Sequence, residues 1–211
     1  MRITVFGATG NVGRRVVAEA LARGHEVTAV VRDPARATDL PAAARIRTGH
    51  ADRADDVAEL TAGQDLVISA TRPAPGSEAE LVATARALLT GLARTGVRLL
   101  LVGGAGSLTL PGTGGTVEDA PDFPASWRPI ALACTAQLEV CRAERGVDWA
   151  YLSPAALLEP GERTGRYRLG TDELLVDAEG NSAISMEDLA VALLDEAEHP
   201  RHHRTRFTVG Y

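Results

Sequence analysis

Short apolar runs alternate with longer amphipathic stretches along the chain. The short runs are rich in β-branched and aliphatic residues, and they predict strands over residues 2–6, 26–31, 45–48, 65–69, 97–102, 148–152 and 205–209. Several of these runs are apolar at almost every position, which is typical of parallel strands that are covered on both faces. The pattern therefore predicts a parallel sheet that is buried between helices.

The stretches between the strands have the period of an amphipathic helix. Residues 11–23 carry one apolar stripe, and Gly24 lies where a helix ends at a C′ glycine. Ser77–Glu80 has the form of a capping box and predicts a helix behind it, as Ser185–Asp188 does near the end of the chain. A further helix is expected over about 130–145.

Strands and helices that alternate in this way form a parallel sheet with right-handed crossovers. We therefore predict an α/β fold, a Rossmann-type doubly wound parallel sheet, with residues 1–211 as one domain. Two irregular stretches, 103–128 and 154–182, follow the fifth and sixth predicted strands. Loops at the carboxyl ends of strands are where such sheets bind ligands, so we expect both to lie close together as small substrate-side elements.

Composition and charge disfavour several classes of protein. Of the 211 residues, 45% are apolar and 24% are charged, as in ordinary globular domains. The formal net charge of −6 disfavours nucleic-acid binding, and we interpret the basic run 201–206 as a solvated loop before the last strand. No apolar run approaches the roughly 20 residues of a membrane span. No signal peptide precedes the first strand, so we expect a cytoplasmic protein with no membrane partner.

The cysteines and histidines point to neither a disulfide nor a metal site. Cys134 and Cys141 are seven positions apart in a predicted helix, so they lie about 10 Å apart, whereas a disulfide needs Cα atoms within about 7 Å. Both are expected to be core residues, with a place in the substrate pocket as the alternative for Cys134. The adjacent His202 and His203 lack the spacing of metal ligands.

Three glycines separate the first strand from the first helix with the spacing Gly-x-x-Gly-x-x-Gly. Gly7 would permit the tight turn, Gly10 would let a pyrophosphate approach the backbone, and Gly13 would let the helix pack close to the sheet. Free amide groups and the helix dipole would then hold the anion. The alternative is a tight turn that binds nothing, but the context favours a dinucleotide-binding loop.

The end of the second strand favours NADP(H) over NAD(H). Arg32 comes first after the apolar run, and its guanidinium can bind a 2′-phosphate with two parallel hydrogen bonds. Arg14 and Arg36 could add positive charge. Asp33 supports the alternative, because a carboxylate at this place binds the ribose hydroxyls of NAD. A third reading takes these arginines as ordinary surface residues.

These motifs resemble those of the atypical short-chain dehydrogenase/reductase superfamily, and within it the NmrA-like NAD(P)H-binding group. The resemblance covers essentially the whole chain. The segments that carry it are Gly7-Ala8-Thr9-Gly10-Asn11-Val12-Gly13, Val30-Val31-Arg32-Asp33-Pro34, Val67-Ile68-Ser69-Ala70, Val102-Gly103-Gly104-Ala105-Gly106-Ser107-Leu108 and Tyr151-Leu152-Ser153-Pro154.

The resemblance implies a role for each matching position. The implied pyrophosphate and adenosine-phosphate contacts are Gly7, Thr9, Gly10, Asn11, Val12 and Arg32. The implied contacts along the rest of the cofactor, up to the nicotinamide ring, are Ser69, Ala70, Thr71, Gly103, Gly104, Ala105 and Pro154.

Two departures from the family pattern limit the chemistry. Gly49-His50 stands where the family often has Gly-Asp, so the adenine contact is in doubt, although Asp52 could substitute. The helix segment 130–139 lacks the Tyr-x-x-x-Lys of catalytic members, and all 22 basic residues of the chain are arginine. The usual proton relay is therefore missing, which argues against simple alcohol dehydrogenation.

A bound nicotinamide could still reduce an acceptor that needs little acid catalysis, since the protein then mainly supplies orientation. The candidate catalytic residue is Ser107, with a structural loop serine as the alternative. Candidate substrate contacts are Arg72, Phe123, Trp127 and Cys134. Phe123 and Trp127 could form an apolar lid over an aromatic or quinone-like substrate, whereas plain packing is the alternative for them and for Cys134 and Thr135.

Three functions are consistent with these residues. The first is an NADPH-dependent oxidoreductase that acts on a quinone, flavin or conjugated carbonyl. The second is a non-catalytic NADP(H)-binding redox sensor, and the third a redox-neutral isomerase, epimerase or dehydratase. The chain has no heptads and no long apolar surface stretch, so we expect a monomer or weak homodimer.

Overall fold

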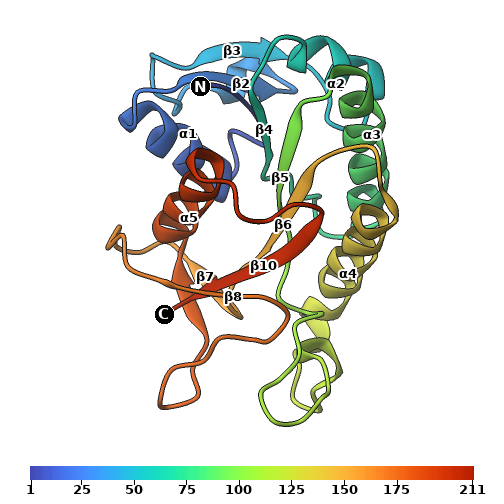
Figure 1. Ribbon diagram of the computed structural model, residues 1–211, viewed down its shortest axis with the longest axis vertical. Coiled ribbons are helices and arrows are strands. Elements are labelled where there is room, and N and C mark those ends of the chain that lie inside the picture. Colours follow the sequence, from blue (N-terminus) through green and yellow to red (C-terminus); the bar gives the residue numbers. More distant parts are fainter.

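The computed structural model describes residues 1–211 and is built around an eight-stranded sheet, with strand order β3-β2-β1-β4-β5-β6-β10-β8 (Figure 1). Its strands are β1 (Arg2–Phe6), β2 (Glu26–Val31), β3 (Arg45–Thr48), β4 (Leu66–Ser69), β5 (Arg98–Val102), β6 (Trp149–Ser153), β8 (Arg168–Gly170) and β10 (Thr205–Gly210). All neighbours in the sheet are parallel except β8, which is the antiparallel edge strand beside β10. The Rossmann-type fold predicted from the alternation of elements is confirmed.

Helices cover both faces of the sheet (Figure 1). Helices α1 (Asn11–Ala22) and α5 (Met186–Glu198) pack together on one face. On the other face α3 (Glu80–Thr95) lies between α2 (Ala54–Thr61) and α4 (Arg128–Ala143). Short 3₁₀ turns are η1 (Pro34–Arg36), η2 (Val117–Asp119) and η3 (Ala125–Trp127).

Two apolar cores follow from the alternation of side chains along the strands. In β6, Ala150 and Leu152 face the core under α1 and α5, while Trp149 and Tyr151 face the core under α3 and α4. The chain winds outward through β1, β2 and β3, then returns to β4 on the other side of β1. This reversal is a topological switch point, and the carboxyl ends of β1 and β4 there form the crevice in which such sheets bind ligands.

Most predicted strand boundaries agree with the structure to within one residue, but three short strands were missed. β7 (Leu157–Glu159) and β9 (Ala183–Ser185) form a separate two-stranded parallel sheet, and β8 joins the main sheet. β7 and β8 lie within 154–182, which was predicted to be irregular, and β9 follows directly after it. Strands of three residues are too short to show a periodic pattern, and their partners are distant in the chain.

One predicted helix cap is correct and one is wrong. The Ser185 hydroxyl accepts a hydrogen bond from the Asp188 amide at 2.9 Å and begins α5. The predicted capping box at Ser77 does not form, because α3 begins at Glu80 after Ala79, which has no side-chain cap. The Glu78 carboxylate instead accepts from the Gly76 amide at 2.9 Å and closes a local turn.

The two irregular stretches meet, as predicted. The Leu174 amide donates to the Thr109 carbonyl at 2.9 Å, and the Thr109 amide donates to the Asp172 carbonyl at 2.8 Å. The loops after β5 and β6 are thus joined beside the carboxyl ends of the strands. None of the helices is both long and apolar enough to cross a membrane.

Candidate cofactor and substrate site

The glycine loop is packed so tightly that side chains are excluded at Gly7 and Gly13. Gly7 has a φ of 75°, and an added Cβ there would lie 2.5 Å from the Ala70 carbonyl oxygen. An added Cβ on Gly13 would lie 2.0 Å from the Gly7 carbonyl oxygen. The loop therefore lies directly between the end of β4 and the first turn of α1.

The amino end of α1 suits an anion. Gly10 is its N-cap and provides no side-chain hydrogen bond, and no acidic residue lies in the first turn. Thr9, Gly10 and Asn11 are exposed, while the Arg14 guanidinium donates to the Asn11 side chain. The Gly10 amide donates to the Gly7 carbonyl at 3.0 Å. The remaining amides of a helix N-terminus, beside a cation, are the features that bind a pyrophosphate. The glycine cradle thus fits the phosphates of a dinucleotide.

The two charged residues after β2 have different surroundings. Asp33 accepts a hydrogen bond from the Ala35 amide at 3.0 Å and caps η1, so its carboxylate already serves the local turn. Arg32 is exposed and extends from the end of β2. Next along this edge, Asp52 lies 3.8 Å from His50 Nδ1 and is about half exposed.

The segment after β4 lies against the glycine loop. The Ala70 amide donates to the Phe6 carbonyl at 3.0 Å, which joins the ends of β4 and β1. The hydroxyls of Ser69 and Thr71 lie 3.2 Å apart. The structure therefore brings three of the predicted cofactor residues, Ser69 to Thr71, to the predicted pyrophosphate loop.

The segment after β5 passes close to β6 and α4. An added Cβ on Gly103 would lie 2.0 Å from the Tyr151 ring, and one on Gly104 would lie 3.0 Å from Cys134 Sγ. The Tyr151 hydroxyl donates to the Cys134 carbonyl at 2.9 Å. Burial raises the pKa of Tyr151 well above its usual value, so this phenol stays neutral and anchors α4 to the sheet.

Ser107 is held by Arg206, a buried residue of the run that was predicted to be solvated. Arg206 Nη1 donates to the Ser107 hydroxyl at 2.9 Å and to its carbonyl at 3.1 Å, and Arg206 also pairs with Asp172. Arg206 is only 6% exposed, so the interpretation of 201–206 as solvated is wrong for this residue. It is buried because it lies in β10, a strand between β6 and β8 in which every residue from Arg206 to Gly210 is buried. The hydroxyl proton of Ser107 is left to donate elsewhere.

Cys134 lies on α4 between two charged residues. Burial raises the pKa of its thiol to about 11, while the charge of Arg72 opposes this shift and that of Glu118 adds to it. Cys134 is partly buried and Cys141 is fully buried, and both are free thiols, as predicted. Arg72 is exposed at the end of β4. The charges of Arg72 and of Glu118 thus both act on Cys134, and Glu118 was not among the predicted site residues.

The two aromatic residues predicted to form a lid differ in exposure. Phe123 is half-buried, and the Arg128 guanidinium lies 5.7 Å from its ring centroid. Trp127 is 53% exposed on η3. Pro154, predicted to lie near the nicotinamide, is buried at the end of β6.

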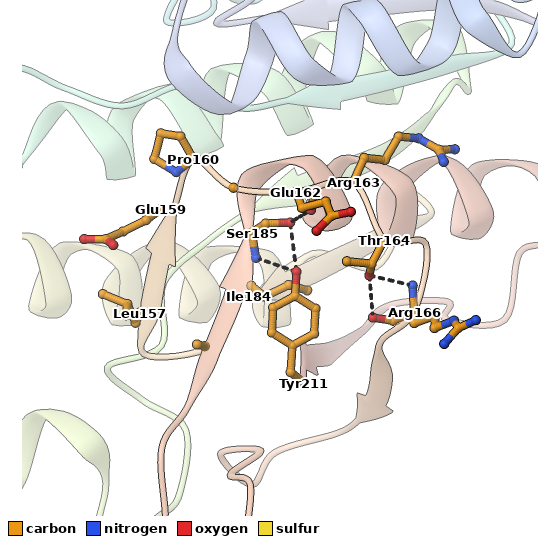
Figure 2. Close-up of a pocket in the computed structure, with 12 residues that line it drawn as sticks. Leu157, Glu159, Pro160, Glu162, Arg163, Thr164, Arg166, Ile184, Ser185 and Tyr211 are labelled. Carbon is orange, nitrogen blue, oxygen red and sulfur yellow. Dashed lines mark hydrogen bonds between the residues drawn. The ribbon is translucent and has the colours of Figure 1, made fainter.

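A cavity of about 800 Å³ is lined by no residue of the glycine loop. Figure 2 shows it between β7, β9, the segment 159–166 and the C-terminal Tyr211, whose hydroxyl accepts from the Ser185 amide at 3.1 Å. It is connected to α1 through Glu187, which accepts from the Gly161 amide at 2.7 Å and pairs with Arg15 at 2.5 Å.

Glu118 and Arg206 gave little signal in the sequence. Glu118 lies in a stretch rich in glycine and proline, without periodicity that would indicate a buried side chain. Arg206 lies inside the predicted strand 205–209, and this position was the available clue that its side chain is buried.

Known proteins match this chain over its whole length. A family model described as NAD(P)H-binding matches residues 7–200. The uncharacterized Bacillus subtilis protein YwnB is 41% identical over 99% of this chain and 98% of its own length.

Two solved structures are similar. One is a candidate epimerase from Bacteroides thetaiotaomicron, with 42% identity, a TM-score of 0.91, and coverage of 100% of this chain and 96% of that chain. The other is a candidate NADH-flavin reductase from Streptococcus pneumoniae TIGR4, with 34% identity, a TM-score of 0.89, and coverage of 100% and 99%. Similarity of this extent covers the glycine loop and the substrate-side segments alike.

Proposed function

The chain belongs to the NAD(P)H-binding family, and from this premise we propose that it is an NADPH-dependent oxidoreductase that reduces a quinone, flavin or conjugated carbonyl acceptor. The observation that carries the proposal is the glycine cradle, where side chains are excluded at Gly7 and Gly13 and the amino end of α1 is open. When bound, a reduced nicotinamide supplies a hydride to the acceptor. The protein has to bind the cofactor and the acceptor, orient them toward each other, and exclude water.

The cofactor contacts follow from the loop and the strand ends. We assign the pyrophosphate to the segment Gly7–Val12, with charge added by Arg14, and the nicotinamide ribose to Gly103–Ala105. Arg32 is assigned to the 2′-phosphate, since its guanidinium is exposed while the neighbouring Asp33 is engaged in capping η1. This favours NADPH over NADH.

The acceptor is inferred from what α4 lacks. No Tyr-x-x-x-Lys lies on this helix, so a poorly stabilised alkoxide would have no conventional proton relay. Quinones, flavins and conjugated carbonyls give delocalised anions on reduction and need less acid catalysis. The Streptococcus pneumoniae relative is described as a candidate NADH-flavin reductase, which supports the same class of acceptor. Within the family, we propose that the chain is an NmrA-like atypical short-chain dehydrogenase, which the motif Gly7–Gly13 and the segment Val102–Leu108 support.

The absence of that relay also supports a second candidate, an NADP(H)-binding redox sensor without turnover. The name of the Bacteroides thetaiotaomicron relative, a candidate epimerase, supports a third, redox-neutral chemistry. The Ser107 hydroxyl, oriented by Arg206, could serve the reductase or the redox-neutral reaction by donating to a substrate oxygen.

The deciding experiment begins with binding. NADPH and NADH are titrated against the fluorescence of Trp127 and Trp149, and absorbance of the reduced nicotinamide is then followed with quinones, flavins and conjugated carbonyls. Tight NADPH binding with turnover supports the reductase. Tight binding without turnover supports the sensor or the redox-neutral enzyme, and failure to bind either nucleotide contradicts all three.

A further inference from the structure

His50 lies beside Arg32, the residue assigned to the 2′-phosphate. β2 and β3 are parallel neighbours in which Val31 pairs with Thr48, and the Gly49 amide donates to the Val31 carbonyl at 3.1 Å. The pairing therefore continues past the end of both strands, where Arg32 leaves β2 and His50 follows Gly49. Both residues emerge at the carboxyl ends of the strands, where a Rossmann-type sheet binds the adenosine ribose of a dinucleotide.

The turn that carries His50 is held in place by α2. The Asp56 carboxylate accepts a hydrogen bond from the His50 amide at 2.9 Å, and the His50 carbonyl accepts from the Arg53 amide at 3.4 Å. An added Cβ on Gly49 would lie 2.4 Å from the Leu60 side chain, so this glycine lets α2 pack against the turn. The backbone therefore fixes the position of His50, and its imidazole takes part in none of these contacts.

The His50 imidazole has no hydrogen bond to another residue of the chain. Its ion-pair contact is with Asp52, whose carboxylate lies 3.8 Å from Nδ1, and this is beyond hydrogen-bonding distance. The side chain is 33% exposed, so solvent or a ligand can reach it. An imidazole has at least one N–H donor in either of its protonation states. That donor is available to a group bound at the end of β2.

The charged groups around the ends of β2 and β3 leave cations free rather than carboxylates. Arg32 and Arg53 are exposed, and neither guanidinium binds another residue of the chain. The carboxylates are engaged, since Asp33 caps η1 and Asp56 accepts from the His50 amide. A ligand group that reaches these strand ends therefore meets free N–H donors. Such donors suit an anionic phosphate, because hydrogen bonds to a charged acceptor are the stronger ones.

We propose that His50 is a specificity-determining residue that binds the 2′-phosphate of NADPH together with Arg32. This rests on the proposed NADPH-dependent function and adds a second donor to the one cation assigned there. The imidazole N–H donates to one phosphate oxygen, and the Arg32 guanidinium donates to the others. A carboxylate at position 50 would repel the phosphate instead. The pair therefore acts on the choice between NADPH and NADH and takes no part in hydride transfer.

The test measures binding of the adenosine half of the cofactor alone. Adenosine 2′,5′-bisphosphate carries the 2′-phosphate and adenosine 5′-phosphate lacks it, so the ratio of their dissociation constants, from titration calorimetry, isolates that phosphate. We expect the wild-type chain to prefer the bisphosphate about 100-fold, and His50→Leu, which removes the donor, to lower this preference about tenfold. His50→Asp should abolish the preference by repulsion, whereas His50→Gln keeps an N–H donor and should retain it.

Thr90→Asp is the matched control for His50→Asp. It adds a carboxylate at an exposed position in the second half of α3, away from the carboxyl ends of the strands, and the wild-type ratio should be kept. Circular dichroism checks that each variant folds, and if His50→Asp does not, His50→Leu and His50→Gln carry the test. A wild-type ratio in His50→Leu, or equal losses in His50→Leu and His50→Gln, would overturn the role of His50.

The failure of the proposed function has a different signature. If the wild-type chain binds the two adenosine phosphates equally well, the assignment of NADPH is rejected and the role of His50 with it. If the wild-type preference is lost in Arg32→Ala and kept in His50→Leu, NADPH remains the cofactor and only the role of His50 is rejected. Because the ratio involves no turnover, it decides the role of His50 even if the chain reduces no acceptor.

Discussion

Arg32 and Asp33 are sequence neighbours of opposite charge, and their surroundings decide what each can bind. The Asp33 carboxylate accepts from the Ala35 amide within its own turn, while the Arg32 guanidinium is exposed. A sequence motif alone leaves both as candidate nucleotide contacts. The local hydrogen bond is what favours a 2′-phosphate over a ribose diol at this position.

Removal of the Arg32 guanidinium should therefore weaken NADPH binding selectively. We expect Arg32→Ala to raise the NADPH dissociation constant at least tenfold, since charge-assisted hydrogen bonds contribute about 1.5–3 kcal/mol. NADH binding should change little. Fluorescence titration measures both, with Arg86→Ala, an exposed arginine on α3, as the control. Equal losses for the two nucleotides would contradict the assignment.

At the scale of elements, α1 and α5 are joined by charged side chains as well as by their apolar faces. Glu19 on α1 is buried and accepts from Arg23 at 2.8 Å and from Arg163 at 2.7 Å. Arg23 also pairs with Asp195 and Glu198 on α5. The network fastens the segment that carries Arg163 to the helix that begins at the glycine loop.

This network should make stability depend on pH. Hydrogen bonds from Arg163 above all lower the pKa of Glu19 from 4.5 to about 2, against the opposing effect of burial. A carboxyl group with a lowered pKa stabilises the fold above its unfolded pKa and loses this effect as the pH falls through the folded value. The thermal midpoint should therefore decrease as the pH is lowered from 4.5 to about 2.

Glu19→Gln should weaken that fall and lower the midpoint at neutral pH, because two arginines lose their partner. Glu139→Gln, which removes an exposed ion pair on α4, serves as the control and should change little. Thermal unfolding followed by circular dichroism at a series of pH values measures both. An unchanged pH dependence in Glu19→Gln would show that other carboxyl groups are responsible.

Ser77 and Ser185 were both predicted to begin a helix, so their substitution offers a matched comparison. Ser185→Ala removes the N-cap of α5 and should lower the free energy of unfolding by about 1 kcal/mol. Ser77→Ala should be close to neutral, because α3 begins without a cap from Ser77. Urea denaturation measures the difference, and equal effects of the two substitutions would contradict the observed caps.

At the scale of the whole molecule, the sheet brings distant segments of the chain to one edge. The glycine loop, the ends of β4 and β5, and Pro154 after β6 all lie at carboxyl ends of parallel strands. Helices on both faces leave this edge as the place where backbone amides and polar side chains meet. The site is therefore a product of the winding order rather than of any single motif.

The distribution of exposed apolar side chains bears on association. They are spread over several elements, and the larger ones are Met1, Ile46, Trp127, Leu132, Leu157, Leu169 and Tyr211. Leu157 and Tyr211 line one cavity, whereas Met1, Ile46, Trp127, Leu132 and Leu169 do not line it. A stable interface needs a larger contiguous apolar patch than two such side chains make. We propose a monomer or weak homodimer. Sedimentation equilibrium should give a mass near 22.1 kDa at low micromolar concentration, and a constant doubled mass on dilution would reject this.

The sequence by itself determined the features that depend on local order. The alternation of apolar runs and helical stripes specified the main strands and helices, because side-chain period differs between strand and helix. The spacing of Gly7, Gly10 and Gly13 after a strand predicted the tight turn into α1, where the backbone admits no side chain at Gly7 or Gly13. It also placed Ser185 as a cap, because capping acts over three residues.

Only the tertiary structure decided which distant residues meet. The short strands β7, β8 and β9 form by pairing with remote partners, and they are too short to show a periodic pattern of their own. Arg206 reaches Ser107, and Thr135 reaches Glu118, across separations that no local pattern encodes. Burial of these polar groups and their hydrogen bonds depend on how loops fold over the strand ends, and that is set by the packing of the whole chain.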